Sequence, residues 1–369
     1  MKQLIGIFII ISLCFFSCTH EEAEGNGPGG NSNILTLTYT IPDAIAVGGT
    51  TRAVNYVEAT AQESTVNGLH LLFFNSDSHG NGTFVATATA TLKDASLKQN
   101  SITVTLPPEV NTANEYAVLV IANLTNYMTD AGELTAYLAS FQTKTYGQAM
   151  AELQVALPEE TVGSETTCTF PGGILPMSGT TVKLAGKTAM SVDLLRAAVR
   201  IDVKVWDALT GSITLNEVQL RNVASVVPYF RTQEEITVPR VTCTKLRVTA
   251  DNQIKGGLYA VETSLDVSDP HKLLNSATCL LININRPLLH TGADADKTWY
   301  RVNLNVNGEG MQYLKRNNAY TVVITGVFAL GSSTPEGAYY DKATLIDAVT
   351  VPTDWKSSGA GTPPDVVIQ

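Results

Sequence analysis

Residues 35–41 read Leu-Thr-Leu-Thr-Tyr-Thr-Ile, and this stretch decides the fold class. Leu35, Leu37, Tyr39 and Ile41 alternate with threonines. A period of two is typical of a β-strand with one buried face, because successive side chains of a strand point to opposite sides. The alternation therefore predicts a strand that packs these four side chains against a core.

A glycine-containing segment separates this strand from an arginine. Pro42 ends the strand, and residues 46–51 read AVGGTT before Arg52 and Ala53. Segments of this composition are preferred sites of proteolytic nicking. We predict that the bond between Arg52 and Ala53 is a maturation site.

Most of the chain after Arg52 consists of short runs rich in β-branched residues, broken by Gly, Asn, Asp and Pro, as in antiparallel β proteins. The predicted strands are Leu69–Phe74, Thr83–Leu92, Ile102–Leu106, Tyr116–Ala122, Ala197–Trp206, Ile213–Val223, Thr278–Ile284, Trp299–Val306, Tyr320–Val327 and Thr344–Val351. Between 129 and 153, Leu134, Leu138 and Phe141 recur at helical spacing, which predicts one or two short helices.

A break in composition divides the folded chain. Pro171-Gly172-Gly173 and Pro176 lie close together near midchain, and each half has its own set of strands. We place the boundary near residue 180, which predicts two tandem β-sandwich domains, 53–180 and 181–369.

The N-terminus reads as an export signal. Lys2 precedes an apolar run, 4–13, that is too short to span a membrane, so residues 1–17 are predicted to be a signal peptide. Cys18 follows a small residue and precedes polar sequence, which predicts lipidation there. Ordinary secretion without lipid is the alternative. Residues 18–52 would then form a lipidated propeptide that contains the strand.

Charge and cysteine usage exclude some partners and leave one question open. The formal net charge is −10, so nucleic acid is a poor partner. Cys168, Cys243 and Cys279 have no metal-binding spacing. One pair could form a disulfide, or all three could be buried thiols.

The sequence carries no recognisable catalytic constellation. The sequence contains no G-x-S-x-G nucleophile elbow, no H-E-x-x-H zinc-binding motif and no P-loop for phosphate. Its five histidines are scattered. Asp294 and Asp296 resemble the start of a calcium loop, but the expected glycine and distal glutamate are missing, so a solvated turn is favoured. We expect neither enzyme activity nor a metal or other cofactor.

Several segments occur in the order seen in one known family. They are Leu69–Phe74, Val118–Asn123, Leu175–Gly179, Leu194–Ile201, Leu314–Val322 and the terminal Trp355. In this order the chain resembles the Bacteroidales fimbrillins, the type V pilins, with Arg52 at the family's maturation site.

The resemblance implies a subunit of a surface fimbria built from two transthyretin-like sandwiches. It implies a lipoprotein precursor at the outer membrane and cleavage after Arg52 by an arginine-specific protease. It also implies loss of the strand 35–41 and filling of its groove by the C-terminal strand of an identical or related subunit. A donor strand must be extended and must alternate like residues 35–41, which describes Leu345, Val349, Val351 and Trp355 near the C-terminus, with Asp347 interrupting this set.

Three alternatives stay open. Possession of both a cut site and a C-terminal donor favours a repeating stalk subunit over an anchor or tip subunit. A surface glycan-binding lipoprotein should carry aromatic platforms, whereas Trp206 and Trp299 lie in strand patterns that read as buried. The tail 356–369 could be a second donor strand or a disordered end.

Overall fold

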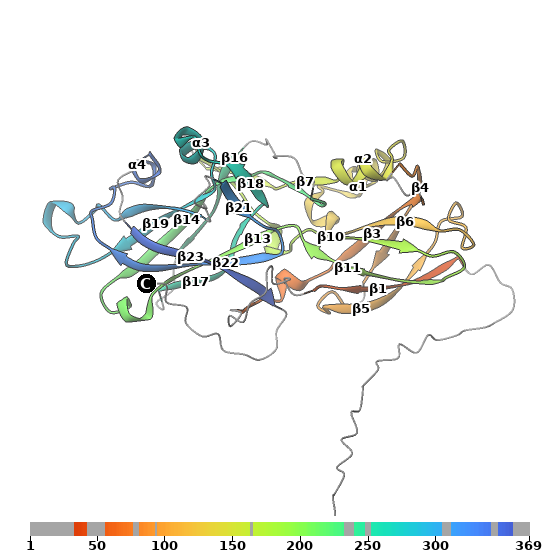
Figure 1. Cartoon of the computed structure of the whole chain (residues 1–369), viewed down its shortest axis with the longest axis horizontal. Helices are drawn as coiled ribbons and strands as arrows, with labels where there is room; N and C mark the ends of the chain where they lie inside the picture. Colours follow the sequence, from red (N-terminus) through yellow and green to blue (C-terminus); the bar gives the residue numbers. More distant parts are fainter. Residues whose placement is uncertain are drawn as a thin grey trace, which may run out of the picture. The chain divides into compact units, whose positions relative to one another are not determined.

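The structure is a computed structural model of the chain (Figure 1). It describes residues 33–42, 56–76, 81–92, 94–162, 165–231, 240–247, 252–304, 311–340 and 346–356. The predicted signal peptide, Cys18, Arg52, Ala53 and Leu345 lie outside these ranges.

Two sheets make up most of the N-terminal half (Figure 1). A three-stranded sheet has the order β11-β1-β5, and a five-stranded sheet has the order β12-β10-β6-β3-β4. The strands are β1 (Ile34–Thr40), β3 (Gly68–Asn75), β4 (Phe84–Thr91), β5 (Gln99–Thr105), β6 (Tyr116–Ala122), β10 (Met177–Lys183), β11 (Ala189–Asp193) and β12 (Leu195–Arg196).

Two larger sheets dominate the C-terminal half. One has the order β17-β13-β22-β23-β2 and the other β20-β19-β14-β16-β9-β8. The strands are β2 (Tyr56–Glu58), β8 (Glu159–Val162), β9 (Glu165–Cys168), β13 (Val199–Val205), β14 (Thr214–Ala224), β16 (Arg240–Arg247), β17 (Gln253–Ala260), β19 (Cys279–Asn285), β20 (Trp299–Asn303), β22 (Asn318–Val327) and β23 (Ile346–Lys356).

Short pairs and helices complete the described part of the chain. The pairs are β7 (Gln154–Ala156) with β15 (Val226–Pro228), and β18 (Thr263–Asp266) with β21 (Met311–Leu314). The helices are α1 (Ala131–Ala139), α2 (Tyr146–Glu152), α3 (Pro270–Asn275) and α4 (Pro335–Tyr340). The mostly β prediction and the two helices between 129 and 153 are confirmed, whereas α3 and α4 were missed.

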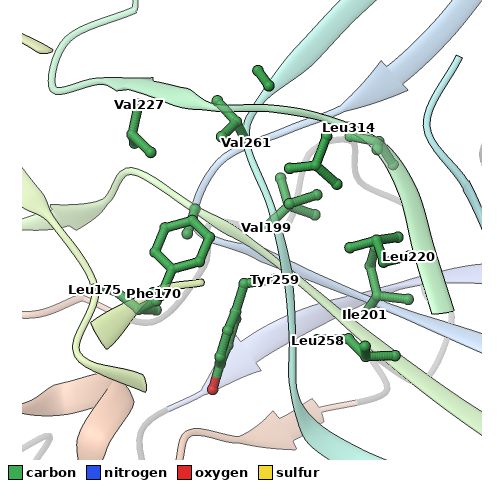
Figure 2. Packing of buried hydrophobic residues seen from close by; sticks show 14 of the residues in the cluster. Phe170, Leu175, Val199, Ile201, Leu220, Val227, Leu258, Tyr259, Val261 and Leu314 are labelled. Atoms are coloured by element: carbon green, nitrogen blue, oxygen red, sulfur yellow. The ribbon is translucent and has the colours of Figure 1, made fainter. Parts of the chain in front are cut away.

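The central strands of the N-terminal half are buried on both faces. Leu69, Leu71 and Phe73 of β3 pack with β1 in one core, while Leu72 and Phe74 pack in a second core. Strands covered on both sides read as continuous apolar runs, which explains the sequence of β3. The second core continues into the C-terminal sheets (Figure 2). There the rings of Phe170 and Tyr259 pack edge to face, with their centroids 5.7 Å apart.

The chain crosses between the two sets of sheets more often than a boundary at 180 allows. That position lies inside β10, which pairs with β6, and β11 pairs with β1 of the N-terminal half. Earlier in the chain, β2 and β9 pair with β23 and β16 of the C-terminal half. We therefore place the main change of sheets between β12 and β13, while the segments 56–58 and 159–168 are exchanged between the halves.

Trp206 corrects the sequence interpretation. The strand that was predicted to include it, β13, ends at Val205, and Trp206 is 40% exposed. Alternation of apolar residues does not show at which residue a strand ends, because the first residue after the strand can continue the same apolar pattern. Trp299 is buried, as the strand pattern indicated.

His70 is a buried titratable side chain on β3. Its Nδ1 lies 3.0 Å from the Thr89 hydroxyl, and its Nε2 has no hydrogen-bond partner among the described residues. Burial lowers the pKa of His70 from 6.5 to about 4, because an imidazolium would lose its hydration there. The folded state therefore holds this ring neutral.

We expect this histidine to make stability depend on pH. Its folded pKa is below the unfolded value, so its contribution is present above pH 6.5 and is lost as the pH falls toward 4. The difference between the two pKa values corresponds to about 3 kcal/mol at most. Denaturant unfolding of wild type and His70→Leu at about pH 7.5 and 4.5 should show wild type losing about 2–3 kcal/mol more than the variant. Parallel losses in the two proteins would contradict this.

Candidate assembly site

Strand β1 is the central strand of its sheet. It pairs parallel with β11, from Thr36 opposite Ala189 to Thr40 opposite Asp193. On its other edge it pairs antiparallel with β5, from Ile34 opposite Thr105 to Thr40 opposite Gln99. Both edges of β1 are thus satisfied, and its removal would leave two unpaired edges facing one another across a gap.

Three alternating apolar side chains of β1 and the side chain of Ile41, which follows the strand, pack in the N-terminal core. Leu35, Leu37 and Tyr39 are fully buried, and Ile41 is 2% exposed. Burying four such side chains stabilises the fold by on the order of 10 kcal/mol at most. The Tyr39 hydroxyl donates to the Leu97 carbonyl oxygen at 3.0 Å, and burial raises the pKa of this phenol. The strand therefore packs a row of apolar side chains into the N-terminal core, and on its other face the Thr38 hydroxyl lies 2.8 Å from the Ser101 hydroxyl.

The last described strand, β23, lies in a different sheet. Val349 is opposite Val323 of β22 and Val351 is opposite Thr321, while Trp355 is opposite Val57 of β2. Within one chain the structure does not bring the predicted donor residues to the groove of β1. It pairs residues 346–354 of β23 with β22 on one edge and residues 354–356 with β2 on the other.

A buried polar cluster, which sequence reasoning missed, ties residues 60–64 to the C-terminal half. Nη1 of Arg200 donates to Glu63 Oε2 at 3.1 Å, and Nε and Nη2 donate to the two carboxylate oxygens of Asp202 at 2.9 and 3.0 Å. The Tyr259 hydroxyl donates to Glu63 Oε1 at 2.6 Å. Glu63 and Arg200 are fully buried. We call Glu63, Arg200, Asp202 and Tyr259 the Glu63 cluster.

The oppositely charged side chains of the Glu63 cluster stabilise one another. Burial alone would lower the pKa of Arg200, but Asp202 and Glu63 raise it overall. Burial raises the pKa of Asp202, and burial also raises that of Tyr259, whose hydroxyl stays a donor. A buried ion pair of this kind is costly to break from one side, because the remaining charge loses its partner.

The segments that carried the family resemblance have identifiable structural roles. Asn123 has a positive φ of 65° and its side-chain amide donates to the carbonyl oxygens of Thr65 and Leu175, both at 2.8 Å. A Cβ at Gly179 would overlap the Asp193 carbonyl oxygen. Nε of Arg196 donates to the Glu63 carbonyl oxygen at 2.8 Å. These residues join strands that are distant in sequence.

The remaining candidates are placed as follows. Cys168 of β9 is opposite Cys243 of β16 by backbone register, while Cys279 lies on β19, with β14 between it and β16. Asp294 pairs with Lys297 at 2.7 Å. Among the described residues, no three His, Cys, Asp or Glu side chains are arranged to hold a metal ion. None of the described helices has the length and apolar character needed to cross a bilayer.

Comparison with known families bears on the part of this arrangement that contains β1. Residues 36–212 match the family model described as major fimbrial subunit protein (FimA). The resemblance to the fimbrillin family is confirmed. The residues that match the fimbrillin model begin inside β1 and end beyond β13. They include most of β1, Glu63 and Arg200. It describes a structural subunit rather than an enzyme.

Solved structures share the fold of this chain at low identity. A candidate cell adhesion protein of Parabacteroides distasonis is 14% identical with a TM-score of 0.53, covering 89% of this chain and 99% of its own. The tip fimbrial protein Mfa3 of Porphyromonas gingivalis, with C-terminal truncation, is 15% identical with a TM-score of 0.50, covering 87% and 100%. A search of curated proteins finds no match.

Proposed function

We propose that this chain is a fimbrial subunit that polymerises at the cell surface by exchange of β1 for a strand of another subunit. The single observation that carries the proposal is the position of β1. Three of its side chains and that of Ile41, which follows it, are at most 2% exposed, both of its edges are paired, and the chain continues from it to Arg52. A cut after Arg52 would convert this inner strand into a separate peptide.

The groove left by β1 defines what can replace it. Its occupant must be extended, must supply backbone groups to β5 and β11, and must present apolar side chains at alternate positions. The C-terminal strand of a second copy is extended and carries Val349 and Val351 at alternate positions, with Asp347 as the polar interruption of this set, and it would join subunits without a covalent bond. We propose Leu345, Val349, Val351 and Trp355 as the donor positions, although in its own chain β23 must first leave β22.

Export and surface attachment belong to the same proposal. Residues 1–17 would direct export, and Cys18 would carry the lipid that holds the precursor at the outer membrane until cleavage releases the propeptide 18–52. Possession of both Arg52 and a C-terminal strand favours the repeating stalk position, with an adhesive fibre as the product. An anchor or tip subunit remains the second assignment within the same fimbria.

We expect Arg52→Ala to abolish assembly. Incubation of the purified precursor with an arginine-specific protease should give a product that begins at Ala53 and forms polymers on size-exclusion chromatography and in electron micrographs. The Arg52→Ala precursor should keep β1 in its groove and stay monomeric, with unchanged thermal stability.

A matched variant separates cleavage from the loss of the arginine side chain. Arg52→Lys should stay monomeric with the arginine-specific protease but polymerise with a lysine-specific one. Polymers of normal length from uncut Arg52→Ala would refute strand exchange.

A further inference from the structure

The strand that follows Arg52 is the outer partner of the last strand of the chain. β2 pairs parallel with β23, with Tyr56 opposite Asp354, Val57 opposite Trp355 and Glu58 opposite Lys356. In the five-stranded sheet, β23 therefore lies between β22 and β2, and β2 is the edge strand. The chain thus passes from β1 in one sheet, through the cut site, to a strand that covers β23 in another.

We propose that β2 is a latch on β23 and that the cut after Arg52 opens it. This inference rests on the proposed function, in which β23 is the donor strand. A strand with partners on both edges can leave its sheet only when both ladders break. Because β2 pairs with the last three residues of β23, 354–356, on its outer edge, the segment that follows the cut site holds the C-terminal end of β23 and must let go before the whole strand can leave.

The latch is short, so its stability depends on how its ends are held. Three residues in a parallel ladder are marginal by themselves. Before cleavage, the upstream end of β2 is tied through residues 41–55 to β1, whose side chains are buried in the N-terminal core. After cleavage only residues 53–55 precede β2. Releasing one end increases the entropy that β2 gains when it detaches, which favours the open state.

The downstream end of β2 stays anchored by the Glu63 cluster. Glu63 Oε2 accepts from the Thr60 backbone N–H at 2.7 Å and from Arg200 at 3.1 Å, and Arg196 donates to the Glu63 carbonyl oxygen at 2.8 Å. This fixes the chain two residues beyond β2. Cleavage would therefore loosen β2 from its upstream end only, and one cut would prepare both the acceptor groove and the donor strand.

Hydrogen exchange of the β23 amides tests the latch without requiring assembly. We expect Val57→Pro in the uncut precursor to raise the exchange of residues 354–356, the part of β23 that pairs with β2, at least tenfold, because proline disturbs the pairing of an edge strand. Cleaved wild-type monomer, isolated before it polymerises, should show a similar increase. Thr161→Pro on β8, an edge strand of another sheet, should leave β23 exchange unchanged.

The outcomes separate the latch from strand exchange itself. Unchanged β23 protection in both Val57→Pro and cleaved wild type would overturn the latch, even if cleaved protein polymerises. Faster β23 exchange in cleaved protein that never polymerises would support the latch and refute the proposed function. If Val57→Pro also deprotects β13, the variant is globally unfolded, and the latch is then tested by cleaved wild type alone. Selective deprotection of β23 in cleaved wild type supports the latch. Its absence overturns the latch.

Discussion

Replacing Arg200 with methionine should lower the free energy of unfolding by about 3–5 kcal/mol. Arg200 is fully buried and donates to both Glu63 and Asp202. Methionine fills a similar volume but leaves two buried carboxylates without their cation. Denaturant unfolding followed by circular dichroism would measure the loss.

A surface ion pair provides the matched control. Lys144 and Glu152 are 2.8 Å apart with side chains 32% and 49% exposed, so Lys144→Met should cost less than about 1 kcal/mol. Arg200→Lys keeps the charge but loses the two-pronged contact with Asp202, and its stability should fall between wild type and Arg200→Met. Equal, small losses in all three variants would show that the Glu63 cluster does not stabilise the fold.

The double variant Val349→Lys/Val351→Lys should prevent polymerisation of cleaved protein completely. In the proposed joint these positions enter the apolar groove left by β1, and two unpaired charges there would cost several kcal/mol. In the sheet that β23 occupies in its own chain, the two positions are opposite Val323 and Thr321, which are partly exposed. We therefore expect the uncut monomer to fold. Size-exclusion chromatography after cleavage would measure assembly, and thermal unfolding would measure the monomer.

The neutral variant Val349→Thr/Val351→Thr is the control for this effect, since it keeps the β-branched shape without charge. It should assemble, with weaker joints than wild type. Fibres from the lysine variant would show that β23 does not enter the groove in the proposed register. Failure of the uncut lysine variant to fold would show that these positions belong to the core of their own sheet.

The sequence pattern predicted the structure correctly where a local rule governs that structure. Strand β1 and its inward side chains, Leu35, Leu37 and Tyr39, follow from alternation, because the pleat of a strand fixes which side chains share a face. Helix α1 follows from helical spacing behind Asp130, whose side chain accepts from the Glu133 backbone N–H, whereas α2 begins at a separate capping box of Thr145 and Gln148. The end of β13 before Trp206 did not follow, since no local signal marks it.

By itself, the sequence determined the mostly β class, the strand 35–41 with its buried face, and the segment that carries Arg52. Tertiary structure alone decided that β1 lies between β5 and β11, that β2 covers β23, and that Glu63 pairs with Arg200 across 137 residues of sequence. The physical reason is that periodicity fixes which side of a strand is apolar. The choice of neighbour depends on how the whole set of strands packs, which no short stretch encodes.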